Sequence, residues 1–97
     1  MDGRRGMTGN VNQIVTLKAK AAALGRRAIW TVFAWPRDYP TGYVARMFEV
    51  TSAGPKPTDK TIRSIDLEPI RDKLARADLV CITHEGSGES DIVESWI

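Results

Sequence analysis

The two side chains best suited to nucleophilic chemistry, Cys81 and His84, lie three positions apart. A thiol becomes a good nucleophile beside a base, and His84 is the single histidine of the chain. On a strand, however, residues three apart point to opposite faces, so these side chains do not meet without a bend. Val80 and Ile82 flank the cysteine, and an apolar setting keeps a thiol protonated. We therefore expect Cys81 to be a buried structural cysteine and His84 to lie at the surface.

The segment from His84 to Ser90 partly matches two catalytic motifs and completes neither. Gly88 stands where the zinc-protease helix motif needs its second histidine. Ser87 lacks the glycines two residues to either side that a nucleophile elbow needs. One histidine and one cysteine do not fill a four-ligand zinc site, and no carboxylates stand at calcium-loop spacing. The sequence predicts a glycine-rich flexible connector here, no metal or other cofactor, and no enzymatic activity.

The length and composition indicate one small soluble domain. The chain has 97 residues, of which 42% are hydrophobic and 27% charged, as in globular proteins that build a single modest core. A single cysteine forms no internal disulfide, which favours the cytoplasm. The longest apolar stretch, 28–35, is far shorter than a membrane-spanning helix, and no secretory signal is recognisable. We expect a cytoplasmic protein that does not bind membranes.

Basic residues are concentrated in the first part of the chain. Residues 1–37 hold seven basic residues against one acidic residue, whereas residues 38–97 have a net charge of −4. Such an arm can neutralise phosphates, so one hypothesis is a nucleic-acid-binding accessory protein. The alternatives are a solvated tail, or a helix that docks on the sheet or on another subunit. The nucleic-acid hypothesis assigns binding to Arg4, Arg5, Lys18, Lys20, Arg26 and Arg27.

Two helices are predicted by apolar residues at helical spacing. Residues 1–10 show no such period and are expected to be disordered, while residues 12–24 predict an alanine-rich helix that ends near Gly25. The clearer helix is 67–77, with Asp66 as its N-cap and Pro69 in its first turn. Its apolar stripe is formed by Leu67, Ile70, Leu74 and Ala77.

The strands are predicted by alternating or continuous short apolar runs. Residues 29–35 carry apolar side chains on both faces, which indicates a central strand, and should pair with 43–50 as an antiparallel hairpin. Residues 52–59 contain Gly54, Pro55 and Pro57 and are expected to form a loop before a short strand at 61–65. Further strands are expected at 79–83 and 92–97. The pattern predicts an α+β two-layer sandwich: a largely antiparallel sheet of four or five strands, one main helix, and an N-terminal basic helix of uncertain docking. Residues 1–28 would be an arm and 29–97 the domain.

The tip of the predicted hairpin combines aromatic residues, prolines and an arginine. Such residues suit a recognition loop, although the aromatic rings could equally fold back and cover the hairpin. Together with unpaired sheet edges, the tip predicts a domain that binds a partner protein or a second copy of itself. The residues we assign to this recognition are Arg37, Asp38, Tyr39, Tyr43 and Arg46.

Two segments also carry a resemblance. The run Pro36-Arg37-Asp38-Tyr39-Pro40, followed by the strand from Tyr43, and the ending Ile92-Val93-Glu94-Ser95-Trp96-Ile97 resemble a group of short bacterial proteins of unknown function. The resemblance covers residues 30–97 and excludes the basic arm. This chain lacks the proline that those proteins place before the last strand. The resemblance implies a bacterial cytoplasmic origin and assigns no activity, cofactor or catalytic residue.

Overall fold

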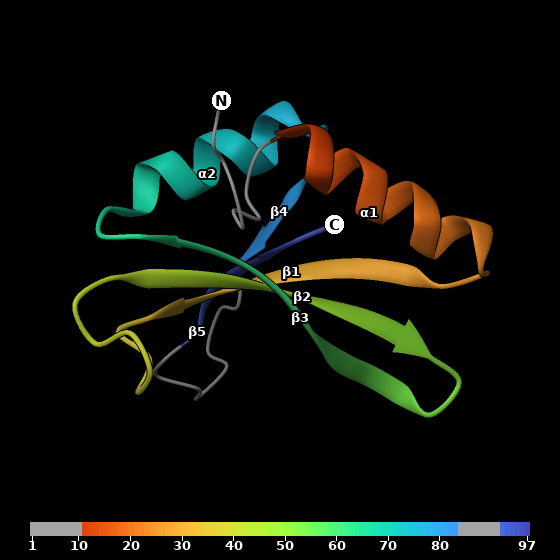
Figure 1. Ribbon diagram of the computed structural model, residues 1–97, viewed down its shortest axis with the longest axis horizontal. Coiled ribbons are helices and arrows are strands. Elements are labelled where there is room, and N and C mark those ends of the chain that lie inside the picture. The colour runs from red at the N-terminus through yellow and green to blue at the C-terminus, as the bar shows by residue number, and fades with distance from the viewer. Residues whose placement is uncertain (1–10, 84–91) are drawn as a thin grey trace.

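The computed structural model of the chain describes residues 11–83 and 92–97. Their elements, in chain order, are α1 (Val11–Ala23), β1 (Arg27–Ala34), β2 (Tyr43–Thr51), β3 (Gly54–Ser64), α2 (Leu67–Arg76), β4 (Cys81–Thr83) and β5 (Ile92–Trp96) (Figure 1). The disorder predicted for 1–10, the connector predicted for 84–90 and the surface position predicted for His84 lie outside the described residues.

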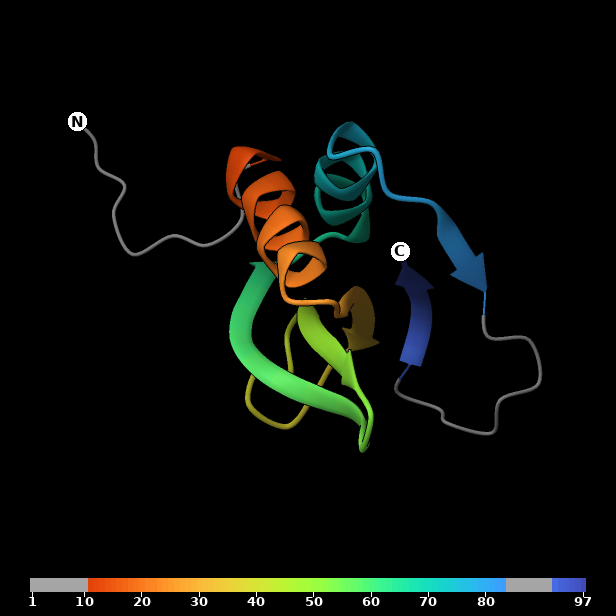
Figure 2. The ribbon, with the colours of Figure 1, turned by 90° about the vertical axis from the view of Figure 1, so that its right-hand side faces the viewer.

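The five strands form one antiparallel sheet in the order β3-β2-β1-β5-β4. The predicted hairpin is confirmed, with Ile29 opposite Phe48 and Ala34 opposite Tyr43. As its apolar composition indicated, β1 is the central strand. Both helices lie on one side of the sheet (Figures 1 and 2), so the protein is an α+β two-layer sandwich.

The third strand is the main difference from the sequence-based expectation. Residues 54–59, expected to form most of a loop, instead begin β3, which runs from Gly54 to Ser64. Pro55 pairs with Val50 and Pro57 with Phe48. Proline removes a backbone donor, and sheets therefore tolerate it on edge strands, which is where β3 lies. The loop prediction was wrong because proline excludes only a central strand.

The helices fulfil their predicted bounds within a residue or two. Ile70, Leu74 and Ala77 of the predicted stripe are buried. Asp66 occupies the N-cap position, but its side chain makes no capping hydrogen bond. At the end of α1, Gly25 has φ of +72°, and the Arg26 amide donates to the Ala21 carbonyl, with N and O 2.8 Å apart. This is the left-handed glycine turn that commonly ends helices.

The helix α1 packs on the sheet and belongs to the core. Ile14 and Ala21 are each 1% exposed, and α1 contacts both β1 and α2. This helix was expected to belong to an arm at 1–28 separate from 29–97, whereas its buried residues Ile14 and Ala21 pack into the same core as the sheet. The largest fully buried side chains are Trp30, Ile14, Met47, Ile62, Ile70, Leu74 and Val32. Within the described part of the chain, neither helix has the length and apolar character needed to span a membrane.

Candidate partner-binding surface

The hairpin tip is two consecutive tight turns. The Tyr39 amide donates to the Pro36 carbonyl (N···O 2.9 Å), and the Gly42 amide donates to the Tyr39 carbonyl (N···O 3.3 Å). The Trp35 and Tyr43 ring centroids are 5.9 Å apart, while Trp35 remains 63% exposed. The two rings therefore contact one another, and Trp35 still presents apolar surface at the tip.

The five residues assigned to recognition do not share one surface. Arg37 and Asp38 are exposed at the tip, while Tyr39 is half-buried beneath the Arg63 guanidinium, 5.8 Å from its ring centroid. Tyr43 packs against the core on the helix side of the sheet. Arg46 lies three residues further along β2 and therefore points to the other side.

That other side of the sheet is a surface on which no described helix packs (Figure 2). Trp30, Val32 and Met47 are buried beneath the helices, so the residues that alternate with them face away. We call this side the open face. Val44, opposite Phe33, is buried on this face. The half-buried or exposed apolar side chains of the open face are Ile29, Phe33, Phe48, Val50, Ile82 and Ile92.

Phe33 and Phe48 form the centre of the open face. Their ring centroids are 6.5 Å apart, a favourable distance for an aromatic pair. Thr31 is paired with Arg46 across β1 and β2, and the two phenylalanines flank this pair from opposite ends. Thr31 is only 9% exposed, and its hydroxyl lies 3.0 Å from that of Ser95. The hydroxyl groups of Thr31 and Ser95 are thus hydrogen-bonded to each other within the protein.

Arg46 and Arg63 of the open face are drawn toward its margin. Arg46 donates from Nη1 to the Thr58 carbonyl in β3. Arg63 of β3 lies over the Tyr39 ring. A third arginine, Arg27, stands opposite Val50 at the end of the face, so the middle of the face presents apolar atoms.

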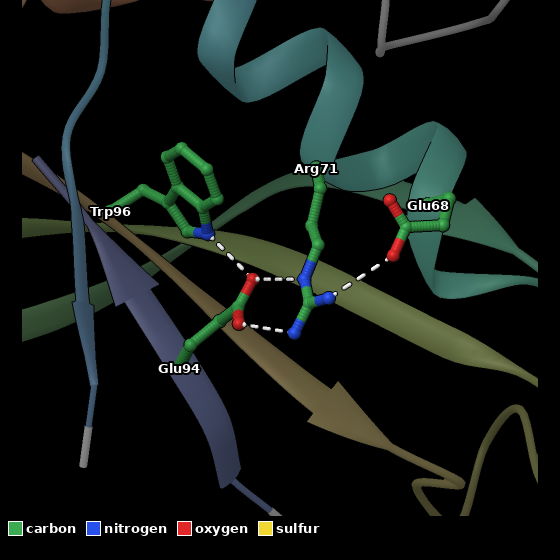
Figure 3. Close-up of polar contacts among 4 residues, drawn as sticks. All are labelled: Glu68, Arg71, Glu94 and Trp96. Atoms are coloured by element: carbon green, nitrogen blue, oxygen red, sulfur yellow. Dashed lines mark hydrogen bonds and ion pairs between the residues drawn. The ribbon is translucent and has the colours of Figure 1, made fainter.

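A second cluster, between α2 and β5, contains the most buried charge among the described residues (Figure 3). The side chain of Glu94 is 4% exposed and receives two hydrogen bonds from Arg71, Nε to Oε2 at 3.1 Å and Nη2 to Oε1 at 2.9 Å. The Trp96 indole also donates to Oε2, at 2.9 Å. Arg71 further donates from Nη1 to Glu68, at 3.1 Å. The cluster joins the helix layer to the sheet.

The electrostatics of this cluster shift the pKa values of Glu94 and Cys81 in opposite directions. Burial raises the pKa of Glu94, but hydrogen bonds from Arg71 and Trp96 outweigh it, so the net pKa lies below the usual value. Glu94 therefore stays ionised and is a poor proton donor. Burial and the negative charge of Glu94 raise the pKa of the Cys81 thiol. A thiol that stays protonated is a weak nucleophile.

Cys81 itself corrects a prediction. It was expected in the core because Val80 and Ile82 flank it, but Cys81 is exposed. Val80 and Ile82 are also exposed, at 64% and 44%. The reason is that β4 is the short strand at the other edge of the sheet, so an apolar run there is not enclosed.

The basic residues of the nucleic-acid hypothesis are partly gathered in the structure. Lys18, Arg26 and Arg27 line one surface hollow beside α1, whereas Lys20 does not line it. Arg4 and Arg5 lie outside the described residues. In residues 11–83 and 92–97, no group of three histidine, cysteine or acidic side chains is placed to hold a metal ion.

Comparisons with protein-family models, with curated proteins and with solved structures found no match to this chain. Its function therefore has to be argued from the surfaces described above.

Proposed function

We propose that this chain is a small non-catalytic protein-binding domain of the cytoplasm that works as a homodimer, with two copies packed through their open faces. The observation that carries the proposal is the Phe33–Phe48 pair at the centre of a sheet face on which no described helix packs. Contiguous exposed apolar surface of this kind commonly marks an interaction site. The cytoplasmic location is supported by the single cysteine.

The size of the open face suits a dimer. Strands are about 4.8 Å apart and rise about 3.3 Å per residue. Five strands and the eight residues of β1 therefore define a face of at most about 600 Å². Two such faces bury on the order of 1,200 Å² together, above the roughly 1,000 Å² that a specific interface needs.

The chemistry of the face favours a second copy over a charged partner. Arg46 and Arg63 are engaged within their own chain, so the apolar centre requires no opposite charge to meet it. Two identical sheet faces can interdigitate their side chains across a two-fold axis, as packed sheets do. Phe33 and Phe48 would then fill the middle of the interface, where aromatic anchors contribute most.

The non-catalytic part of the proposal is supported by the Arg71–Glu94 cluster. Both carboxylate oxygens of Glu94 accept hydrogen bonds from neighbouring side chains, and its pKa is lowered. A general acid near neutral pH needs the opposite shift. The cluster therefore fits a structural role between α2 and β5.

The test is the molar mass in solution, measured by size-exclusion chromatography with light scattering. We expect twice the mass of one chain for the wild type, and the mass of one chain for Phe48→Asp. Leu24→Asp is the matched control, since Leu24 is 65% exposed and lies at the end of α1 on the helix side. It should remain dimeric.

Far-UV circular dichroism must show that Phe48→Asp keeps the wild-type fold. If it unfolds, Phe48→Ser, which removes the apolar ring without adding a charge, takes its place and is also expected to be monomeric. A wild-type monomer at all concentrations would contradict the proposal, as would a folded Phe48 variant that stays dimeric.

A further inference from the structure

A groove runs beside α1 and reaches Arg27 at the start of β1. It consists of two surface hollows of about 570 Å³ and about 380 Å³. Lys18, Ala22 and Asp78 line both hollows, so the two are continuous. We call it the basic groove. Volumes of this size are typical of binding sites in proteins.

The floor of the basic groove is apolar and follows the helix axis. Val15, Ala19 and Ala22 are spaced four and three residues apart, so they share one side of α1. From Val15 to Ala22 the helix rises about 10 Å, and the groove continues past its end to Val80. Val15 and Val80 are 47% and 64% exposed, so this floor is open to a ligand.

The rim of the basic groove is strongly cationic. Among the side chains that line it are one carboxylate, Asp78, and four cations, Lys18, Arg26, Arg27 and Arg76, and Ile97 lines it as well. Arg26 is paired with Glu49 and Arg76 with Asp72, both at 3.1 Å. Lys18 and Arg27 form no ion pair with a residue that the structure describes. These two charges are available to a ligand.

We propose that the basic groove binds a short amphipathic helix with an acidic flank, supplied by a partner protein. Apolar side chains of that helix would rest on Val15, Ala19 and Ala22, where the small alanine side chains allow two helices to approach closely. Its carboxylates would meet Lys18 and Arg27. An elongated floor bordered by unpaired cations matches such a helix in both shape and charge.

Lys18 lies on the helix side of this groove, whereas Arg27 stands opposite Val50 of the open face. Lys18→Glu alone therefore tests the groove without changing the face of the proposed dimer. A monomeric protein that binds the helix, or a dimer that does not, would separate the two proposals.

The probe is a blocked synthetic helix of about five turns, long enough to be helical in water, with leucines along one side and glutamates flanking them. Binding to the full chain is followed by fluorescence anisotropy at low salt. We expect saturable binding that weakens as salt is added, and shifts of the Val15, Ala19 and Ala22 amide signals in NMR spectra.

The double variant Lys18→Glu/Arg27→Glu should weaken this binding about tenfold, which corresponds to about 1.4 kcal/mol for the two reversed charges together. Lys60→Glu is the control for charge. Lys60 of β3 lines neither hollow and pairs with its neighbour Asp59, so its reversal should leave the affinity unchanged.

Three results would overturn the proposal. The first is absence of binding at low salt, or binding that the double variant leaves intact. The second is equal binding of a matched peptide in which lysine replaces each glutamate. The third is tighter binding of single-stranded DNA or RNA through Lys18 and Arg27, which would assign the groove to nucleic acid.

Discussion

Arg71 of α2 and Glu94 of β5 form a two-point ion pair between the helix layer and the sheet, with Nη2–Oε1 and Nε–Oε2 distances of 2.9 and 3.1 Å. The planar guanidinium presents two parallel donors to the carboxylate, which fixes orientation as well as distance. Trp96 donates to the same carboxylate. The position of α2 over the sheet therefore depends on one buried acid.

Replacing Glu94 with glutamine should make the unfolding free energy depend less on pH in the acid range. The pKa of Glu94 is lowered in the folded state, so its carboxylate stabilises the fold above the unfolded value of about 4.3. That contribution is lost as the pH falls through the lower folded pKa. Urea unfolding between neutral and acid pH should show a steeper loss below about pH 4.3 for wild type than for Glu94→Gln. The same pH dependence of the unfolding free energy in wild type and Glu94→Gln would contradict the lowered pKa of Glu94.

Removing Arg71 should destabilise the fold more than removing an exposed arginine. Arg71→Met leaves the Glu94 carboxylate buried without its cation, which costs about 3–5 kcal/mol for a fully buried pair. Because the Arg71 side chain is 39% exposed, we expect about 2 kcal/mol. The control is Arg76→Met, which breaks an exposed pair with Asp72 and should cost about 0.5 kcal/mol or less. Equal losses in urea unfolding would be inconsistent with a buried pair.

The Cys81 thiol should react slowly although it is exposed. Burial and the charge of Glu94 raise its pKa, so less thiolate is present at neutral pH than in a free cysteine. It is the single cysteine of the chain, so the rate of alkylation by iodoacetamide reports on it alone. We expect the apparent pKa from the rate profile to fall in Glu94→Gln. An unchanged profile would show that Glu94 does not influence the thiol.

Gly42 should tolerate no side chain. A Cβ at Gly42 would lie 2.5 Å from the Ser64 carbonyl oxygen and 2.6 Å from the Tyr39 ring, and the first of these is backbone. Gly42→Ala must therefore displace the hairpin tip from the end of β3, and we expect a loss of about 3 kcal/mol in unfolding free energy. The comparison is Gly25→Ala, where a Cβ meets nothing within 4 Å and only the positive φ is unfavourable. That variant should lose about 1 kcal/mol. A smaller loss in Gly42→Ala than in Gly25→Ala would contradict this contact.

The local elements could be predicted from the sequence because their signals are local. The apolar stripe of α2 predicted that helix, and the apolar residues on both faces of β1 predicted a central strand. Gly25 predicted the end of α1. The extent of β3 could not be predicted from Pro55 and Pro57. Proline is tolerated in an edge strand and excluded from a central strand, so the prediction requires the strand order. Strand order is a property of the whole sheet.

The candidate surfaces depend on the same non-local information. Phe33 and Phe48 alternate with core residues, but which face the helices cover is decided only when the helices dock. The Arg71–Glu94 pair joins residues 23 positions apart that carry no spacing signal. One clue was present in the sequence, since Glu94 lies two residues before Trp96 in a run that is otherwise mostly apolar. A charge in such a run indicates a paired carboxylate.

The prolines of β3 have a consequence for how large an assembly this chain can build. A sheet that recruits neighbours along its rim can go on adding strands without limit, and Pro55 and Pro57 leave β3 with two fewer backbone donors for such growth. In the proposed dimer the open faces of the two copies cover each other, so no open face remains for a third copy. The proposed dimer should therefore stop at two copies instead of extending into filaments.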